Sequence, residues 1–180
     1  MQKTFYIKSM GCKSNQFEGS VITENMISNG FEQVGSFSEA DFYILNSCSV
    51  THKSDNETLY LLRNAKHIKP DIKTVLTGCV AQIEKEKLLE LDYVDFVFGN
   101  DDKFKIGEAL KNNKTGQVTD IMVVDKFNYQ ELYDTTKTRF SLKIQDGCNN
   151  RSYCIMLEQS FRYHRRSEFL IYTKSSCRHS

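Results

Sequence analysis

Ser9-Met10-Gly11-Cys12 ends a short apolar run with a cysteine, and the same event occurs at two later places in the sequence. Leu45-Asn46-Ser47-Cys48 and Leu76-Thr77-Gly78-Cys79 repeat it. We interpret the three runs as neighbouring parallel strands, each followed at its carboxyl end by a cysteine. Ligands of open parallel sheets bind beyond this edge. The pattern therefore predicts three thiols along one edge of one sheet.

Apolar runs alternate with helical patterns along the first 113 residues. Strands are predicted at 3–8, 41–45, 73–77 and 94–98, and a short extended segment at 31–34. The run 41–45 is apolar without alternation, which is typical of a strand covered on both faces. Helices are predicted from 15 to 30, from 54 to just before Pro70, over 83–90 and over 103–112. This alternation predicts an α/β fold, an open parallel sheet with flanking helices and right-handed crossovers.

Helix boundaries are predicted from capping signals. Asn15 with Glu18 and Ser54 with Glu57 have the spacing of a capping box. Gly30 is placed as a C-terminal cap. The residues expected to face the core from the last two helices are Ile83, Leu88 and Leu89, then Ile106, Ala109 and Leu110.

Composition favours a globular protein, with 39 % hydrophobic and 12 % aromatic residues. The net charge of +1 excludes a chain that is basic throughout, although residues 148–180 carry six Lys/Arg against two Asp/Glu. No apolar run approaches the roughly 20 residues of a membrane span, and the N-terminus lacks the apolar segment of a signal peptide. We expect a cytoplasmic protein, in which the six cysteines serve metal or redox chemistry rather than disulfides.

Three converging thiolates are soft ligands that suit an iron–sulfur cluster, zinc or copper(I). A 4Fe-4S cluster usually takes four cysteines, so three leave one iron open to a sulfur-containing group. Zinc would need a fourth protein ligand, for which His52 is the candidate. The alternative for each cysteine is a role as a small core residue. Glycine before Cys12 and Cys79 favours a site, because it lets the backbone approach a bulky inorganic group.

The resemblance to a known family rests on four segments that occur in order. They are Gly11-Cys12-Lys13-Ser14-Asn15-Gln16-Phe17-Glu18, Asn46-Ser47-Cys48-Ser49-Val50-Thr51, Thr77-Gly78-Cys79-Val80-Ala81-Gln82 and Lys143-Ile144-Gln145-Asp146-Gly147-Cys148-Asn149-Asn150. Together they resemble the radical-SAM methylthiotransferases over residues 1 to about 155. The first and last segments, with Val50-Thr51 and Ser54-Asp55, look most like the branch that modifies threonylcarbamoyladenosine next to the tRNA anticodon. Sister branches act on isopentenyladenosine in tRNA or on a ribosomal protein.

The resemblance implies that Cys12, Cys48 and Cys79 hold an auxiliary 4Fe-4S cluster whose open iron carries the sulfur to be transferred. It also implies a second 4Fe-4S cluster, held by a Cys-x3-Cys-x2-Cys motif in a radical-SAM barrel. That second cluster would cleave S-adenosylmethionine with electrons from a donor such as flavodoxin or ferredoxin. The implied substrate is the anticodon region of tRNA. No catalytic side chain is assigned.

The second cluster motif departs from the family pattern, since only Cys148 and Cys154 of its three cysteines are present. Cys177 lies too far along the chain to replace the third. The predicted division is 1–113 for the α/β domain, 114–138 for a linker, 139–155 for the first strand and degenerate cluster loop of the radical-SAM domain, and 156–180 for an unassigned basic tail, for which our hypothesis is a shifted reading frame. A barrel needs on the order of 200 further residues. We therefore expect a truncated form that houses the sulfur donor without performing the radical step.

The residues alone leave other interpretations of the function open. The chain could be a free-standing iron–sulfur or zinc module for electron transfer or structure, or a fragment of an isopentenyladenosine-tRNA methylthiotransferase. A flavodoxin-like or receiver-like interaction module with incidental cysteines is disfavoured. Its first loop would carry a phosphate-binding run or paired acids, where this sequence has Gly11-Cys12-Lys13.

Overall fold

The computed structural model describes residues 2–48, 52–112, 114 and 118, with the side chains of 52–54 excepted. The linker, the second cluster motif with Cys148 and Cys154, and the basic tail fall outside these residues, apart from Lys114 and Val118. The elements in chain order are β1 (Thr4–Ser9), α1 (Lys13–Ser28), β2 (Glu32–Gln33), β3 (Phe42–Ser47), α2 (His52–Ile68), β4 (Lys73–Gly78), α3 (Cys79–Ile83), α4 (Lys85–Leu89), β5 (Phe96–Phe98), η1 (Asp102–Lys105) and α5 (Ile106–Lys111).

The described strands form one parallel five-stranded sheet in the order β2-β1-β3-β4-β5. The α/β parallel fold predicted from the sequence is confirmed. The chain leaves β1 toward β2 on one side and then returns to β3 on the other side, so the strand order reverses between β1 and β3. This is the doubly wound order in which ligands bind at the switch point, beyond the carboxyl ends of those two strands.

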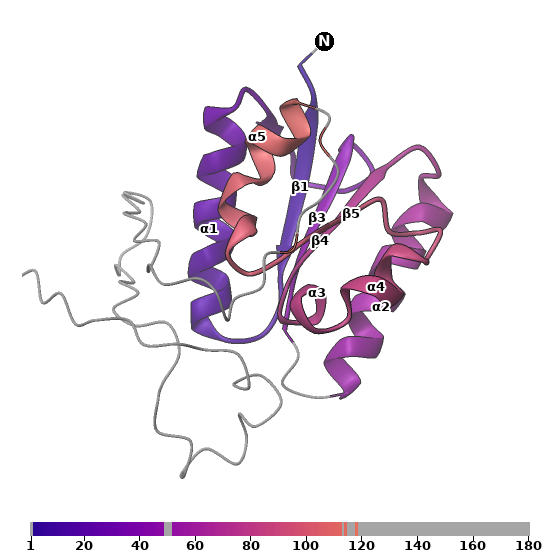
Figure 1. The fold of residues 1–180 in the computed structure, drawn as a ribbon. Helices are drawn as coiled ribbons and strands as arrows, with labels where there is room; N and C mark the ends of the chain where they lie inside the picture. The colour runs from indigo at the N-terminus through magenta and orange to yellow at the C-terminus, as the bar shows by residue number, and fades with distance from the viewer. Residues whose placement is uncertain (1, 49–51, 113, 115–117, 119–180) are drawn as a thin grey trace, which may run out of the picture.

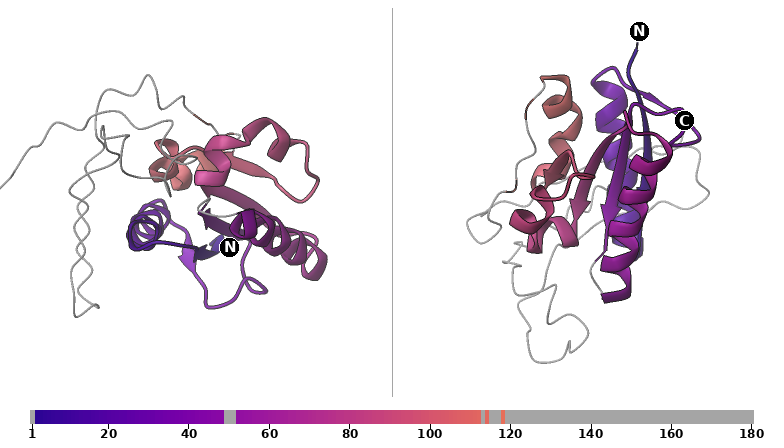
Figure 2. Two further views of the ribbon diagram at one scale, coloured as in Figure 1. Left: turned by 90° about the horizontal axis from the view of Figure 1, so that it is seen from below. Right: turned by 90° about the vertical axis from the view of Figure 1, so that its right-hand side faces the viewer.

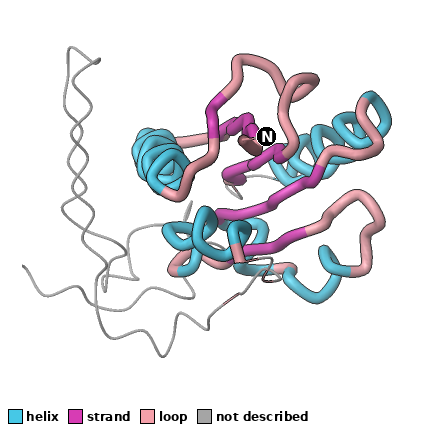
Figure 3. The backbone as a smooth tube through the Cα atoms, turned by 90° about the horizontal axis from the view of Figure 1, so that it is seen from above, coloured by secondary structure: helices cyan, strands magenta, loops and turns pink. Residues whose placement is uncertain are grey.

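Helices cover both faces of the sheet, with α1 and α5 on one face and α2, α3 and α4 on the other (Figures 1 and 3). Alternate residues of each central strand enter the two cores. Phe42 and Ile44 join the core under α1 and α5, while Tyr43 and Leu45 join the core under α2. Every residue of β3 is buried, which explains the unbroken apolar run over its first four residues. Within the described residues, no helix is long and apolar enough to cross a bilayer.

The end of α1 confirms the prediction that Gly30 ends this helix. Gly30 has φ +91°, and its amide N–H donates to the carbonyl of Ile27. The amide of Phe31 donates to the carbonyl of Met26 across the same turn. These two bonds form a Schellman motif. Its left-handed position is usually occupied by glycine, because glycine has no Cβ and adopts this conformation with little strain. The short strand β2 and the end of α2 before Pro70 also agree with the sequence predictions.

Both predicted capping boxes are wrong. Helix α1 begins at Lys13 with Cys12 as its N-cap residue, and α2 begins at His52, which places Ser54 inside the helix. The side chains of Asn15 and Glu18 bind partners from other elements instead, because both are buried in the fold. Local spacing alone cannot reveal such long-range partners.

The helix predicted over 83–90 is two short helices, α3 and α4, and the first begins directly at Cys79. Ile83 and Leu89 are 43 % and 51 % exposed, so their predicted inward orientation is wrong, whereas Leu88 is buried as expected. The helix is interrupted at Glu84, so Ile83 and Leu89 belong to two different helices and do not share one face. In the last helix, Ile106 and Leu110 are buried and Ala109 packs beside them, as predicted.

Candidate functional site

The three cysteines predicted as metal ligands follow three adjacent strands at the carboxyl edge of the sheet. Cys12 caps α1 after β1, Cys48 directly follows β3, and Cys79 is the first residue of α3 directly after β4. The register pairs Ser9 with Asn46 and Ser47 with Gly78, so the strands end nearly level. This edge lies at the bottom of Figure 1 and faces the viewer in the left view of Figure 2. We call these three segments the thiol edge.

Two glycines allow the segments of the thiol edge to pack tightly. Gly11 has φ +84°, and a Cβ built on it would lie 2.5 Å from both the Cβ and the Sγ of Cys48. Gly78 has φ +94°, and a Cβ built there would lie 2.3 Å from the carbonyl oxygen of Ser47. Both positions need a left-handed backbone and have no room for a side chain. The loop before Cys12 therefore lies directly against Cys48.

The thiols differ in accessibility. Cys12 is exposed, Cys79 is half-buried and Cys48 is buried, and none of the three is in a disulfide. Among the described residues, no group of three or more His, Cys, Asp or Glu side chains is close enough to hold one metal ion. The structure thus brings the three cysteine-bearing segments to one edge without gathering the three thiols around a single point. Their role as ligands stays a prediction.

The residues fit an iron–sulfur cluster in donor type, and the three cysteines follow adjacent strands at one edge of the sheet. Cysteine thiolates are the donors that such clusters take, one for each iron, so three cysteines bind three of the four irons. The cysteine thiols around an iron–sulfur cluster therefore lie farther from one another than the ligands of a single metal ion do. At Gly11 and Gly78 the space that a side chain would need is filled by Cys48 and by Ser47, so the structure shows these glycines serving the packing of the cysteine segments against one another.

The side chain of Asn15 connects the carboxyl ends of β1 and β3, a role that the sequence interpretation missed. Its Nδ2 donates to the carbonyl oxygens of Met10 at 2.7 Å, Ser47 at 2.9 Å and Asn46 at 3.2 Å. The side-chain Nδ2 of Asn46 donates in return to the Asn15 carbonyl at 2.9 Å. The available signal was a pair of polar residues, Asn46 and Ser47, that end an otherwise apolar strand directly before a cysteine.

Ser47 connects the carboxyl ends of β3 and β4. Its Oγ donates to the carbonyl of Thr77 at 2.6 Å and accepts a hydrogen bond from the amide of Val80 at 3.3 Å. Two further polar atoms at this level, Asn46 Oδ1 and Thr77 Oγ1, are buried without a hydrogen-bond partner in the part of the chain that the structure describes. Buried atoms of this kind reduce stability, and such local costs are typical of functional sites.

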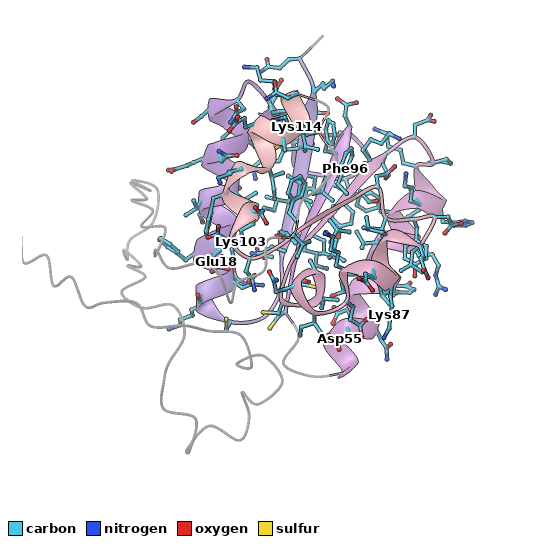
Figure 4. The ribbon with its side chains drawn as sticks, in the orientation of Figure 1. Glu18, Asp55, Lys87, Phe96, Lys103 and Lys114 are labelled. Carbon is cyan, nitrogen blue, oxygen red and sulfur yellow. The ribbon has the colours of Figure 1, made fainter. Side chains whose placement is uncertain are left out.

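A buried ion pair fixes α1 to the segment after β5. Lys103 Nζ lies 2.5 Å from Glu18 Oε2, and the two side chains are 4 % and 7 % exposed. Lys103 also donates to Asn100 Oδ1 at 3.3 Å. Figure 4 shows the two charged side chains side by side between α1 and η1. Helix α1, which carries Cys12 at its start, is therefore held by both Asn15 and Glu18.

Comparison with known proteins supports the resemblance seen in the sequence. The sequence profile of Uncharacterized protein family UPF0004 matches residues 4–99, a segment that includes the whole sheet and all three cysteines of the thiol edge. Among curated relatives, the tRNA-2-methylthio-N(6)-dimethylallyladenosine synthase of Pelagibacter ubique is 32 % identical over 159 residues, which is 83 % of this chain and 36 % of the relative.

Two relatives carry the name threonylcarbamoyladenosine tRNA methylthiotransferase MtaB. The Aquifex aeolicus protein is 31 % identical over 156 residues, covering 83 % of this chain and 38 % of its own length. The Bacillus subtilis protein is 32 % identical over 160 residues, covering 85 % and 36 %. The chain thus spans a little over a third of the length of these relatives. On the profile match and these likenesses, the chain belongs to the UPF0004 family and is similar to the methylthiotransferases that share this N-terminal domain.

Proposed function

We propose that this chain is the cluster-holding part of a tRNA methylthiotransferase, with Cys12, Cys48 and Cys79 as the ligands of an auxiliary 4Fe-4S cluster. The observation that carries the proposal is the placement of the three cysteines. They follow three adjacent parallel strands at one edge, next to the switch point between β1 and β3. This placement lies inside the segment matched by the family profile.

The residues of the thiol edge have separable tasks under this proposal. The cysteine side chains provide three thiolates, and the glycines before Cys12 and Cys79 keep the adjacent backbone free of side chains. Asn15 and Ser47 fix the strand ends relative to each other. When bound, a cluster with three protein ligands supplies one iron to which a sulfur-containing group can attach.

The finer part of the proposal concerns the substrate. We favour threonylcarbamoyladenosine beside the tRNA anticodon, because the segment Gly11-Cys12-Lys13-Ser14-Asn15-Gln16 resembles that branch. Relatives named for threonylcarbamoyladenosine and for dimethylallyladenosine are about equally similar to this chain, at 31 % and 32 % identity. S-adenosylmethionine, a second cluster, a flavodoxin or ferredoxin as electron donor, and a cytoplasmic location complete the proposal.

Anaerobic reconstitution with iron and sulfide tests cluster binding. We expect about four irons per chain at the thiol edge, and a marked loss of iron in Cys12→Ser, Cys48→Ser and Cys79→Ser. Cys177→Ser is the matched control and should retain the wild-type iron content. Zinc without iron in the purified protein would favour a structural zinc module instead. A cluster whose spectrum does not respond to methylthiolate would favour electron transfer.

The substrate is tested in cells that lack their own threonylcarbamoyladenosine methylthiotransferase. The segment of this chain up to residue 112 would replace the corresponding segment of the missing enzyme. Mass spectrometry of tRNA nucleosides should then detect methylthiolated threonylcarbamoyladenosine. Restoration only in cells lacking the dimethylallyladenosine enzyme, with the analogous replacement, would assign the other branch.

A further inference from the structure

Asn15 occupies an unusual position for a buried side chain. It lies in the first turn of α1, three residues after Cys12, and is only 5 % exposed. A buried amide in a helix normally binds a local backbone group or one tertiary partner. Here one Nδ2 atom lies within hydrogen-bond distance of three carbonyl oxygens, at 2.7, 2.9 and 3.2 Å.

The three acceptors belong to the two segments that lead into cysteines. The Met10 carbonyl lies two residues before Cys12, and the Asn46 and Ser47 carbonyls lie just before Cys48. A carboxamide nitrogen carries two N–H donors, so the three oxygens share them. These carbonyls are at strand ends, where the ladder of the sheet no longer satisfies every backbone group.

The contact is reciprocal. Asn46 Nδ2 donates to the carbonyl of Asn15 at 2.9 Å, and the amide of Met10 donates to the carbonyl of Asn46 at 2.9 Å. The first turn of α1 and the end of β3 therefore exchange donors in both directions. Gly11 lies between these bonds, with its Cα directly against Cys48.

We infer that Asn15 is a positioning residue that sets the separation of Cys12 and Cys48. The inference rests on the proposed function for what this separation serves, the binding of a cluster. The geometric part stands on the hydrogen bonds alone. Without the Nδ2 donors, three carbonyl oxygens lose their shared partner. The loop before Cys12 and the first turn of α1 then keep fewer hydrogen bonds to the end of β3, among them the Met10–Asn46 backbone bond and the bond from Asn46 Nδ2 to the Asn15 carbonyl.

The test compares Asn15→Asp with Asn29→Asp in the full chain. An ionised aspartate has no donor, so in place of the amide it would set a negative charge against three carbonyl oxygens. Asn29 undergoes the same chemical change, but its Nδ2 donates to the carbonyl of Asn25, four residues earlier in the chain. Glu18→Gln serves as a second control, because it weakens another buried contact of the same helix.

The readout is the yield of a Cys12–Cys48 link formed by a short dithiol-reactive cross-linker on the reduced, metal-free protein, mapped by peptide mass spectrometry. The reagent attaches to exposed Cys12 and then reaches Cys48. We expect Asn15→Asp to lower the yield about fivefold or more, because the variant loses several hydrogen bonds to partly or fully buried carbonyl oxygens. Asn29→Asp should give the wild-type yield. Glu18→Gln should also give the wild-type yield, even if its urea midpoint falls as far as that of Asn15→Asp.

A yield in Asn15→Asp within about twofold of wild type would overturn the inference, since the bonds at issue are each worth a larger factor. So would an equal loss in Glu18→Gln at an equal urea midpoint, because that result describes general stability. If Asn15→Asp loses its far-UV circular dichroism signal, Asn15→Ser decides by the same criterion. Iron uptake is measured in parallel. Failure of the wild type to bind iron would contradict the proposed function and leave the cross-linking result valid. An unchanged cross-linking yield in Asn15→Asp would contradict the role of Asn15 and leave iron binding by the wild type valid.

Discussion

Gly11 and Cys48 lie in direct van der Waals contact, although 37 positions separate them in the sequence. The contact joins the loop after β1 to the end of β3, at the point where the strand order reverses. It has no space for even one additional carbon atom, since that atom would lie 2.5 Å from the Sγ of Cys48. The first prediction concerns this contact.

Gly11→Ala should destabilise the protein by about 2–5 kcal/mol, the sum of left-handed backbone strain and overpacking. Urea unfolding measures the change. Gly30→Ala is the matched control, because Gly30 has a similar φ of +91° but nothing within 4 Å of a built Cβ. It should cost only the strain, about 1–2 kcal/mol. Equal losses in the two variants would show that the contact with Cys48 contributes nothing.

The buried pair of Glu18 and Lys103 should be strongly coupled. Lys103→Met removes the cation and leaves a carboxylate at a site that is 7 % exposed, which should cost about 3–5 kcal/mol in urea unfolding. Adding Glu18→Gln should restore part of that loss, because the remaining group is then neutral. Additive losses in the double variant would contradict a direct pair.

Asp95 should make the stability depend on pH in the acid range. Burial acts to raise the pKa of this carboxyl, but hydrogen bonds from Lys66 and Thr74 outweigh it and hold the pKa below its ordinary value of 3.8. A carboxyl whose pKa is lower in the folded state contributes its stability fully above the unfolded value. The contribution is lost as pH falls below 3.8 through the folded pKa.

The measurement is the urea midpoint between neutral pH and pH 3 in wild type and Asp95→Asn. The wild-type advantage at neutral pH should shrink as the solution becomes more acid. Asp71→Asn, a change at an exposed aspartate, should leave the acid dependence as in the wild type. A wild-type advantage that is constant with pH would contradict the assigned cause.

Alkylation should distinguish the thiols of the edge. Cys12 is exposed and Cys48 is 5 % exposed, so iodoacetamide should modify Cys12 on the order of ten times faster or more in the native, metal-free protein, because the loop before Cys12 shields Cys48 from a reagent that arrives from solution. Peptide mass spectrometry gives both rates. In urea the two rates should converge, and similar native rates would show that the loop before Cys12 does not cover Cys48.

The sequence predicts the sheet well because each central strand is a run of consecutive apolar residues. Apolar runs such as 41–45 are covered on both faces and cannot be mistaken for amphipathic helices, and each ends at a polar residue or glycine. The position of the cysteines then follows from topology, since parallel strands share one carboxyl edge. The fold class and the alignment of the three cysteine-bearing segments could therefore be predicted without coordinates.

The polar framework of the site could not be predicted in this way. Asn15 and Glu18 have the spacing of a helix cap, but their partners lie 31 and 85 positions away, at Asn46 and Lys103. Tertiary contacts outweighed a local preference that is worth only about 1 kcal/mol. The break between α3 and α4 was missed for a related reason, because the charged run around Glu84 reads as a continuous helix surface.

The two outermost strands are very short, two residues in β2 and three in β5. Within the described part of the chain, the lateral borders of the sheet therefore present few unpaired backbone groups to a second polypeptide. Borders of this length discourage lateral strand addition and amyloid-like stacking between copies. A neighbouring domain or macromolecule would more readily meet this molecule through its helical flanks or at the end where the cysteines lie.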